Sequence, residues 1–317
     1  MISCAAATAL AFGVGACSTT GAGVGAGPPA GDTTTSTTPT TSTSRTPTTS
    51  TPSSTTTAKQ AAETGPEPGF DQLHFSNPTS VTNTWLPLKP GTQLVYEGKT
   101  IEDGETSRHR TVFTVTDLTK LVAGVRTVVV WDRDFADDQL QESELAFFAQ
   151  ADDGNVWHFG QYPEGYEDGK LVETPAWIHG VKGAQAGLTM KAHPQLGARS
   201  YSQGWGPEVG WSDRATAVKT GQRTCVRAGC YTNVLVIDEF SLDEPGAHQL
   251  KYYAPGVGNV RVGWAGNDRT KETLQLVSVV HLSAAARSKV RQEALRLERN
   301  AYQRSKDVYG TTEPMGR

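Results

Sequence analysis

Apolar and polar residues alternate with a period of two over much of residues 75–280, which is the spacing of side chains on a half-buried β-strand. The clearest case is ELAFFAQADDGNVWHFG at residues 144–160. Its two apolar runs are separated by Asp153-Gly154, and Gly tolerates the positive φ that a tight hairpin turn needs. This stretch therefore predicts a β-hairpin with a heavy aromatic content.

Similar strand-forming runs recur at short spacing through the rest of the region, without a sustained helical period. They are residues 92–100, 111–116, 125–131, 216–219, 233–240, 250–253, 260–264 and 273–280. We expect a mainly β fold, a single antiparallel β-sandwich or half-barrel domain spanning residues 69–282.

A helical pattern follows the strands. Ser283 is suited to an N-cap, and Val290, Ala294, Leu297 and Ala301 share one helix face. We expect a C-terminal α-helix at residues 283–309 that packs on the sheet or frays from it, and then a disordered tail at 310–317. A helix that binds a partner or a membrane surface is the alternative, but its apolar face is thin.

The N-terminus has the pattern of an export signal. A short run of small apolar residues ends at Val14-Gly15-Ala16-Cys17, which resembles the lipobox of bacterial lipoproteins. The resemblance implies a signal peptide at residues 1–16 and acyl chains such as palmitate on Cys17. No Lys or Arg precedes Cys17, which departs from the usual basic start. We expect a lipid-anchored protein on the outer side of the cell membrane; the alternative is a cleaved, secreted protein.

Residues 17–68 are rich in Thr, Ser and Pro and poor in apolar groups. Such a segment cannot bury enough apolar surface to offset the entropy of ordering its chain. We expect a disordered tether that extends the β domain away from the membrane and is a plausible substrate for O-glycosylation.

Charge and cysteine content narrow the possibilities further. The net charge is only −4, which gives no indication of a nucleic-acid partner. Cys225 and Cys230 flank a short loop in a domain that we expect to be exported, and they predict a disulfide. The rival interpretation, a zinc site, would need two further ligands nearby.

Candidate catalytic groups are scattered. Carboxylates pair in sequence at Asp132 and Asp134, at residues 137–138 and at 152–153, and we expect solvated turns and edges there. Asp132, Asp134 and Asp138 could instead supply oxygen ligands to Ca²⁺, without the regular spacing of a dedicated site. No HExxH pattern and no GxSxG elbow occurs, and His158 is expected at a surface or rim. We predict no metal and no cofactor.

Several motifs resemble an uncharacterised family of bacterial exported proteins. They are FSNP at residues 75–78, LPLKPGT at 86–92, the FAQ, DGNVW and FG pieces of 148–160, and YYAPGVG at 252–258. The last piece also resembles an element of periplasmic half-barrel domains that bind lipids or lipoproteins. The family pattern has acidic residues at four positions where this chain has none, and this lowers the expectation of an enzyme. Those positions are Ala146, Gln161, Ile178 and Lys182.

Three classes of function are consistent with these observations: a tethered envelope module that binds an apolar or amphipathic ligand, a structural or assembly lipoprotein, and an extracellular hydrolase. The first is favoured because large aromatic residues exceed what the strands need for a core. The residues predicted to contact the ligand are Trp157, Phe159, Trp177, Trp205 and Trp211. Glycines around the last two predict a mobile loop that could close over a site. The alternative is that these rings form the core.

Overall fold

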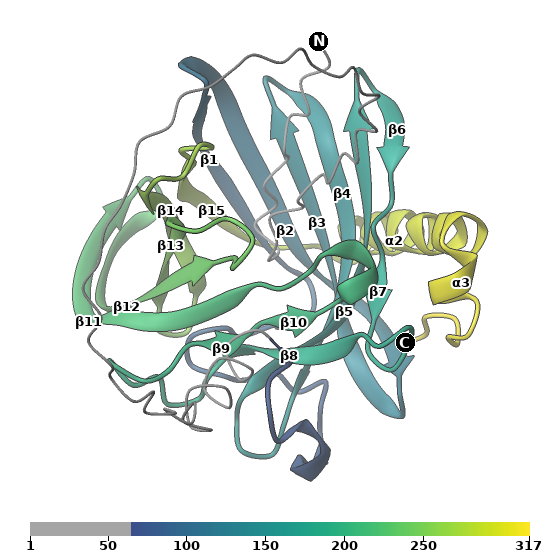
Figure 1. The fold of residues 1–317 in the computed structure, drawn as a ribbon. Coiled ribbons are helices and arrows are strands. Elements are labelled where there is room, and N and C mark those ends of the chain that lie inside the picture. Colours follow the sequence, from purple (N-terminus) through teal and green to yellow (C-terminus); the bar gives the residue numbers. More distant parts are fainter. Residues whose placement is uncertain (1–64) are drawn as a thin grey trace, which may run out of the picture.

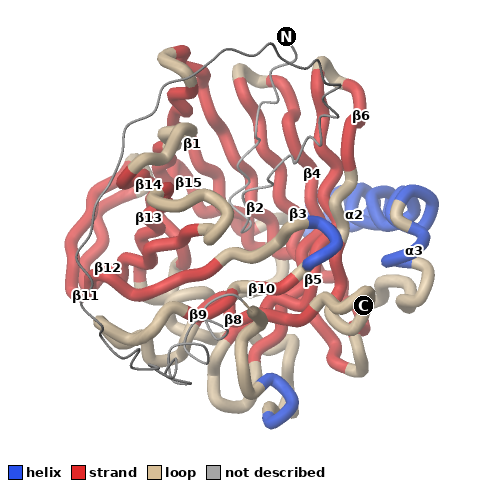
Figure 2. The backbone as a smooth tube through the Cα atoms, in the orientation of Figure 1, coloured by secondary structure: helices blue, strands red, loops and turns tan. Residues whose placement is uncertain are grey.

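The structure, a computed structural model, describes residues 65–317. Cys17, the predicted signal peptide and almost all of the predicted tether lie outside these residues. Within residues 65–317, fifteen strands form the body of the molecule, whose arrangement Figures 1 and 2 show. The long strands of the first half are β1 (Thr92–Glu102), β2 (Glu105–Val122), β3 (Val125–Ala136), β4 (Gln139–Gln150) and β5 (Val156–Glu167). The second half has β11 (Arg214–Val226), β12 (Gly229–Phe240), β13 (Ala247–Ala254), β14 (Gly258–Gly266) and β15 (Thr273–His281).

Short strands connect the two halves. They are β6 (Lys170–Glu173), β7 (Trp177–Ile178), β8 (Gln185–Met190), β9 (Tyr201–Ser202) and β10 (Gly204–Trp205). Two 3₁₀ turns, Phe70–Gln72 and Pro207–Val209, complete this part of the chain. Each half is an antiparallel meander, because consecutive strands are joined by turns such as the predicted β4–β5 hairpin.

The sheet is continuous and curls on itself. Its strand order is β10-β8-β5-β4-β3-β2-β1-β15-β14-β13-β12-β11-β9, so β10 and β9 lie at opposite ends. In the chain these two strands are separated only by Gln203, whose N–H donates to the Asp213 carbonyl at 2.8 Å. The two ends of the sheet are therefore tied by a single segment. This confirms the predicted mainly β, antiparallel fold.

The convex side of the first half carries the helical part. The α2 helix (Ala284–Arg304) packs against β2 and β4, with Ser283 as N-cap accepting from the Ala286 N–H at 3.2 Å. A short helix, α3 (Lys306–Tyr309), follows after Ser305. The C-terminal helix is thus confirmed, although it is interrupted at Ser305. No helix within residues 65–317 is long and apolar enough to cross a membrane.

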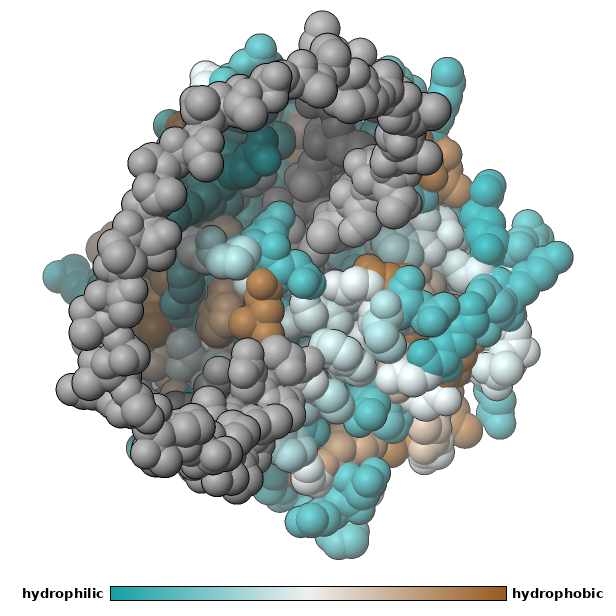
Figure 3. Space-filling model, in the orientation of Figure 1, coloured by the Kyte–Doolittle hydropathy of each residue, from teal (hydrophilic) through white to brown (hydrophobic). Residues whose placement is uncertain are grey.

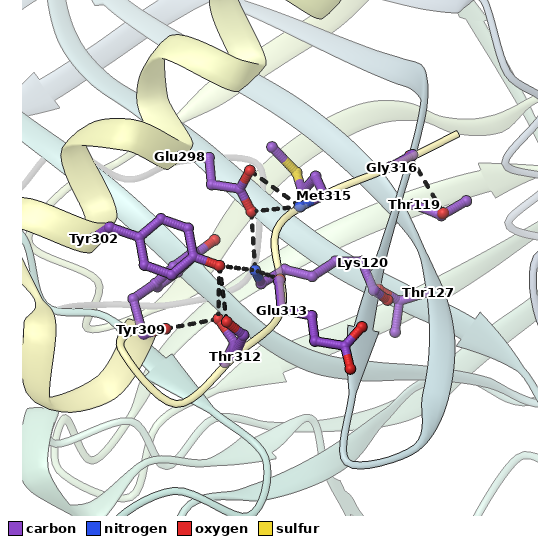
Figure 4. Close-up of polar contacts among 10 residues, drawn as sticks. All are labelled: Thr119, Lys120, Thr127, Glu298, Tyr302, Tyr309, Thr312, Glu313, Met315 and Gly316. Atoms are coloured by element: carbon purple, nitrogen blue, oxygen red, sulfur yellow. Dashed lines mark hydrogen bonds and ion pairs between the residues drawn. The ribbon is translucent and has the colours of Figure 1, made fainter.

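The last residues of the chain return to the sheet instead of forming the disordered tail that the sequence predicts (Figure 4). Lys120, fully buried on β2, donates to Glu298 of α2 at 2.9 Å and to the Glu313 carbonyl at 2.8 Å. Glu298 also accepts from the Met315 N–H at 2.9 Å. Gly316 pairs with Thr119 through two backbone hydrogen bonds. We call this group, Lys120 with Glu298 and residues 313–316, the C-terminal latch.

The predicted disulfide is confirmed. Cys225 and Cys230 are directly opposite each other in the β11–β12 hairpin, with their sulfurs 2.05 Å apart. A bridge that closes so short a loop stabilises this hairpin rather than the whole domain.

Candidate ligand-binding site

Two rows of carboxylates lie on the concave face of the first half of the sheet. Asp132 is directly opposite Glu144, and Asp134 is directly opposite Glu142, on the neighbouring strands β3 and β4. Such cross-strand pairs place their Cβ atoms roughly 4.5–5.5 Å apart on the same face. Asp132 is 2% exposed and Asp134 3%. The expectation of solvated edges is therefore wrong for these two, because the curl of the sheet turns their face inward.

The other carboxylate pairs agree with expectation. Asp137 and Asp138 are exposed in the β3–β4 turn, where Asp138 accepts from Arg108 at 2.8 Å. Asp152 and Asp153 are exposed in the β4–β5 turn. Asp138 is thus separated from the buried pair, which removes the basis for the Ca²⁺ site considered above. Among residues 65–317, no group of three or more His, Cys, Asp or Glu is arranged to hold a metal ion.

His109 on β2 lies at one end of the acidic rows. Its Nε2 is 2.7 Å from Asp134 and its Nδ1 is 3.0 Å from Glu272. Burial alone would lower the pKa of His109, but the hydrogen bonds and charges of these two carboxylates outweigh it and raise the pKa to about 10. His109 is therefore a cation at neutral pH, and both of its nitrogens are engaged.

A second buried cation faces the acidic rows from the other half of the sheet. Lys251 on β13 is 1% exposed, and its Nζ is 2.5 Å from Glu239 on β12. Glu239 also accepts from the Gln203 side chain at 3.0 Å, in the segment that ties the ends of the sheet. The charge of Lys251 reaches Asp132 and Glu144 and favours their ionised forms.

Four oxygens on this face have no hydrogen-bond partner among the residues that the structure describes. They are Asp132 Oδ2, Glu144 Oε1, Thr111 Oγ1 and Gln161 Oε1. Burial, followed by the charge of Asp134, raises the pKa of Asp132 to about 7. Burial, followed by the charge of Glu142, raises the pKa of Glu144 well above its usual range. The four oxygens are therefore polar atoms whose hydrogen bonds the described residues do not complete.

The hollow has a polar entrance and an apolar floor. Figure 3 shows the molecule hollowed between the two halves of the sheet, with hydrophilic residues on the upper part of the visible wall. A pocket of about 310 Å³ near the β12–β13 turn is lined by residues that include Glu239 and Gln249. A smaller cavity of about 30 Å³ lies among apolar and aromatic side chains, including Leu88, Phe113 and Phe148.

The aromatic residues predicted to bind a ligand lie mostly in the core. Trp157, Phe159, Trp177 and Trp211 are each less than 9% exposed, and Trp205 is half-buried. None of the five lines either of the two pockets just described. Ligand binding by these rings stays a prediction, and the acidic concave face is the stronger candidate.

His158 lies among these rings rather than at a surface or rim, so that expectation is wrong. It is fully buried, stacks on Phe148 with ring centroids 4.8 Å apart, and meets Trp177 edge-on at 4.9 Å. Burial lowers the pKa of His158 to about 3. The β-bulge between Phe147 and Phe148 shifts the register at this point and turns the ring inward.

Sequence reasoning missed most of the site, although one signal was present. Asp132, Asp134, Glu142 and Glu144 are spaced two apart on both arms of a hairpin, so strand alternation puts all four on one face. His109, Glu239, Lys251 and Glu272 come from other strands, and no local pattern connects them to the acidic rows.

The raised pKa of Asp132 gives a testable pH dependence. Between about pH 4 and 7 this carboxyl is protonated in the folded protein and ionised in the unfolded chain, so unfolding releases a proton. The free energy of unfolding then falls as pH rises, by up to about 1.4 kcal/mol per pH unit. We expect Asp132→Asn to match the wild type near pH 4 and to be more stable at pH 8.

Urea denaturation at a series of pH values measures this difference. The control is Asp137→Asn, which changes an exposed carboxylate in the turn after β3. Its free energy of unfolding should depend on pH as that of the wild type does. Parallel pH profiles for Asp132→Asn and the wild type would show that Asp132 is ionised in the folded state.

Comparison with known proteins gives fold-level neighbours only. No protein-family model matches the chain, and no curated protein does. One similar solved structure is a protein from Bacteroides fragilis, predicted to be exported, with a YmcC-like fold (TM-score 0.38, 13% identity). Another is a predicted lipoprotein from Parabacteroides distasonis (TM-score 0.30, 12% identity). Each match covers 62% of this chain and 99% of the other. Similarity this low says nothing about what the chain binds.

Proposed function

We propose that this chain is an exported, membrane-anchored protein of the cell envelope whose β domain binds a small amphipathic ligand on its concave face. The observation that carries the proposal is the arrangement of that face, in which unsatisfied polar oxygens occupy one part and apolar side chains another. Asp132 and Glu144 each have a buried oxygen without a hydrogen-bond partner among the described residues, and apolar rings such as Phe113 and Phe148 lie further along the same face. A separate pocket of about 310 Å³ at the rim, which neither Asp132 nor Glu144 lines, is at the lower end of the size that ligand sites have, roughly 300–1,000 Å³.

A hydrolase is the second candidate, because Asp132 and Glu144 lie opposite each other in a hollow that also contains a histidine. Acid–base catalysis by two carboxyls needs their pKa values to be pushed apart, so that one is protonated and the other ionised. Here burial raises the pKa of both. His109 is held as a cation between Asp134 and Glu272, so it is a poor general base. Binding is therefore favoured over catalysis.

Anchoring rests on the Val-Gly-Ala-Cys boundary and on the polar stretch that follows it. We expect a clickable fatty acid fed to the native cells to label the wild type and not Cys17→Ala. Equal labelling of the two proteins would exclude Cys17 as the lipidated residue, and a protein found only in the medium would favour secretion.

Binding is tested by native mass spectrometry of protein extracted gently from its own membrane. We expect a bound species of defined mass in the wild type and its loss from the double variant Asp132→Asn, Glu144→Gln. The matched control Glu105→Gln, Glu167→Gln removes two exposed carboxylates and should keep the ligand. A wild-type protein that carries no small molecule and binds none of the amphipathic probes described below would favour the structural role.

A further inference from the structure

We propose that the ligand carries an organic cation, a primary ammonium or a guanidinium, which the protein holds between Asp132 and Glu144. This inference rests on the proposed function, because it names the chemistry of the head group of the same amphipathic ligand.

The first argument is the balance of charge on the concave face. The carboxyl groups that face the hollow include Asp132, Asp134, Glu142, Glu144, Glu239 and Glu272. Two buried cations face them, and both have carboxylate partners: His109 with Asp134 and Glu272, and Lys251 with Glu239. Asp132 and Glu144 have no ion pair of their own among the described residues.

Nearby arginines in the described part of the chain form no ion pair with the acidic pair, although the charge of Arg133 favours the ionised form of Asp132. Arg133, between Asp132 and Asp134 on β3, points to the convex side and lies over the Trp131 ring at 4.1 Å. Arg110 on β2 likewise lies over the Phe135 ring at 4.0 Å. The strands thus direct their arginines away from the hollow and their carboxylates into it.

The second argument comes from neutral side chains beside the pair. Thr111 is 0% exposed and Gln161 is 4% exposed, yet Thr111 Oγ1 and Gln161 Oε1 have no partner among the described residues. Thr111 is directly opposite Asp134, and Gln161 is directly opposite Ala146, two residues along β4 from Glu144. Both therefore share the face of the acidic pair. Buried polar atoms are rarely left without a partner. Because Thr111 on β2 and Gln161 on β5 lie on opposite sides of the pair, they are acceptors for further donors of the ligand and not for one shared head group.

The third argument separates an organic cation from a metal ion. Within residues 65–317 no three His, Cys, Asp or Glu converge with the spacing of metal ligands. An ammonium offers three donors and a guanidinium five, and either can be shared among carboxylate, amide and hydroxyl oxygens. Ala146 and Phe148 continue the face of Glu144 along β4 towards the small apolar cavity, which gives the apolar part of the same ligand a direction in which to extend, although the cavity of about 30 Å³ does not itself hold it.

The test is titration calorimetry at pH 7.5 with three probes of equal chain length, each below its micelle concentration: n-decylammonium, n-decanol and n-decanoate. We expect n-decylammonium to bind the wild type at least about tenfold more tightly than n-decanol, and n-decanoate not to bind. Loss of a hydrogen bond to a charged group accounts for a change of this size. The variant Asp132→Asn, Glu144→Gln should lose about tenfold or more in affinity for n-decylammonium, while the control Glu105→Gln, Glu167→Gln should lose none.

The outcomes distinguish the two proposals. If n-decanol binds as tightly as n-decylammonium, or if the Asp132, Glu144 variant binds the amine like the wild type, the cation inference is wrong and amphipathic binding stands. If none of the probes binds and no ligand is extracted from the membrane, the proposed function itself fails. Thermal denaturation of each variant separates a loss of affinity from a loss of folded protein. The double variant Asp132→Asn, Glu144→Gln should be at least as stable as the wild type.

Discussion

Replacing Trp211 by alanine is expected to lower the free energy of unfolding by about 3–5 kcal/mol, the usual cost of deleting a large aromatic side chain from a core. Trp211 is 8% exposed, and its ring lies 5.7 Å from that of Trp177 and 5.8 Å from that of His158. The backbone leaves room for both indoles only because residue 204 is glycine. A Cβ there would lie 2.6 Å from Trp211 Nε1 and 2.8 Å from Trp177. Gly204 thus serves close packing.

Urea denaturation followed by circular dichroism measures the loss. Trp205→Ala is the matched control, since Trp205 is half-buried and is expected to cost clearly less. If Trp211→Ala instead keeps nearly wild-type stability and loses its ligand, Trp211 binds the ligand, as the sequence predicts, and is not a core residue.

Removing the carboxylate of the C-terminal latch, by Glu298→Ala, is expected to cost a similar amount, about 3–5 kcal/mol. The change leaves the fully buried Lys120 without its charged partner, and an uncompensated buried charge is strongly destabilising. It also removes the acceptor of the Met315 N–H, so the last residues should detach from the sheet. Burial lowers the pKa of Lys120, and the charge of Glu298 opposes that shift. In Glu298→Ala the pKa of Lys120 should therefore fall further.

The same denaturation experiment tests the latch, with proteolysis of the C-terminus as a second readout. Glu293→Ala is the control on the same helix, because Glu293 pairs with Arg296 at a half-exposed position and such pairs contribute roughly 0–1 kcal/mol. The double variant Lys120→Met, Glu298→Leu should recover most of the stability, since apolar residues of similar volume can replace a buried pair. A double variant no more stable than Glu298→Ala would show that the loss comes from packing and not from the unpaired charge.

Much of the fold could be predicted because its determinants are local. Alternation of side chains identifies strands, Asp153-Gly154 identifies a turn, and Ser283 with a 3.6-residue spacing identifies the helix. The ordered tail at residues 310–317 escaped prediction, since its partners Thr119 and Lys120 are far away in the chain and no apolar periodicity marks it.

The candidate site depends on facts that a local pattern does not contain. Asp132 and Asp134 have the composition of an exposed strand end, and only the curl of the whole sheet buries them. Lys251 acts on Asp132 across the hollow because the two halves of the sheet face each other. For the tryptophans, the sequence predicts a binding face from their number. In the structure, glycine at position 204 and the register of β4 and β5 pack most of them into the core.

The pairing of β1 with β15 has a consequence for how the chain reaches its folded state. Neighbouring strands elsewhere in the two meanders are joined by short turns, but this pairing connects Lys99 with Thr273, 174 residues apart. Local hairpins form before such distant contacts, because the entropy of closing a long loop must be overcome first. As the chain is synthesised from its N-terminus, one edge of β1 would stay unpaired until β15 is available. An open strand edge recruits other strands, so crowding of unfinished chains should favour intermolecular pairing at β1.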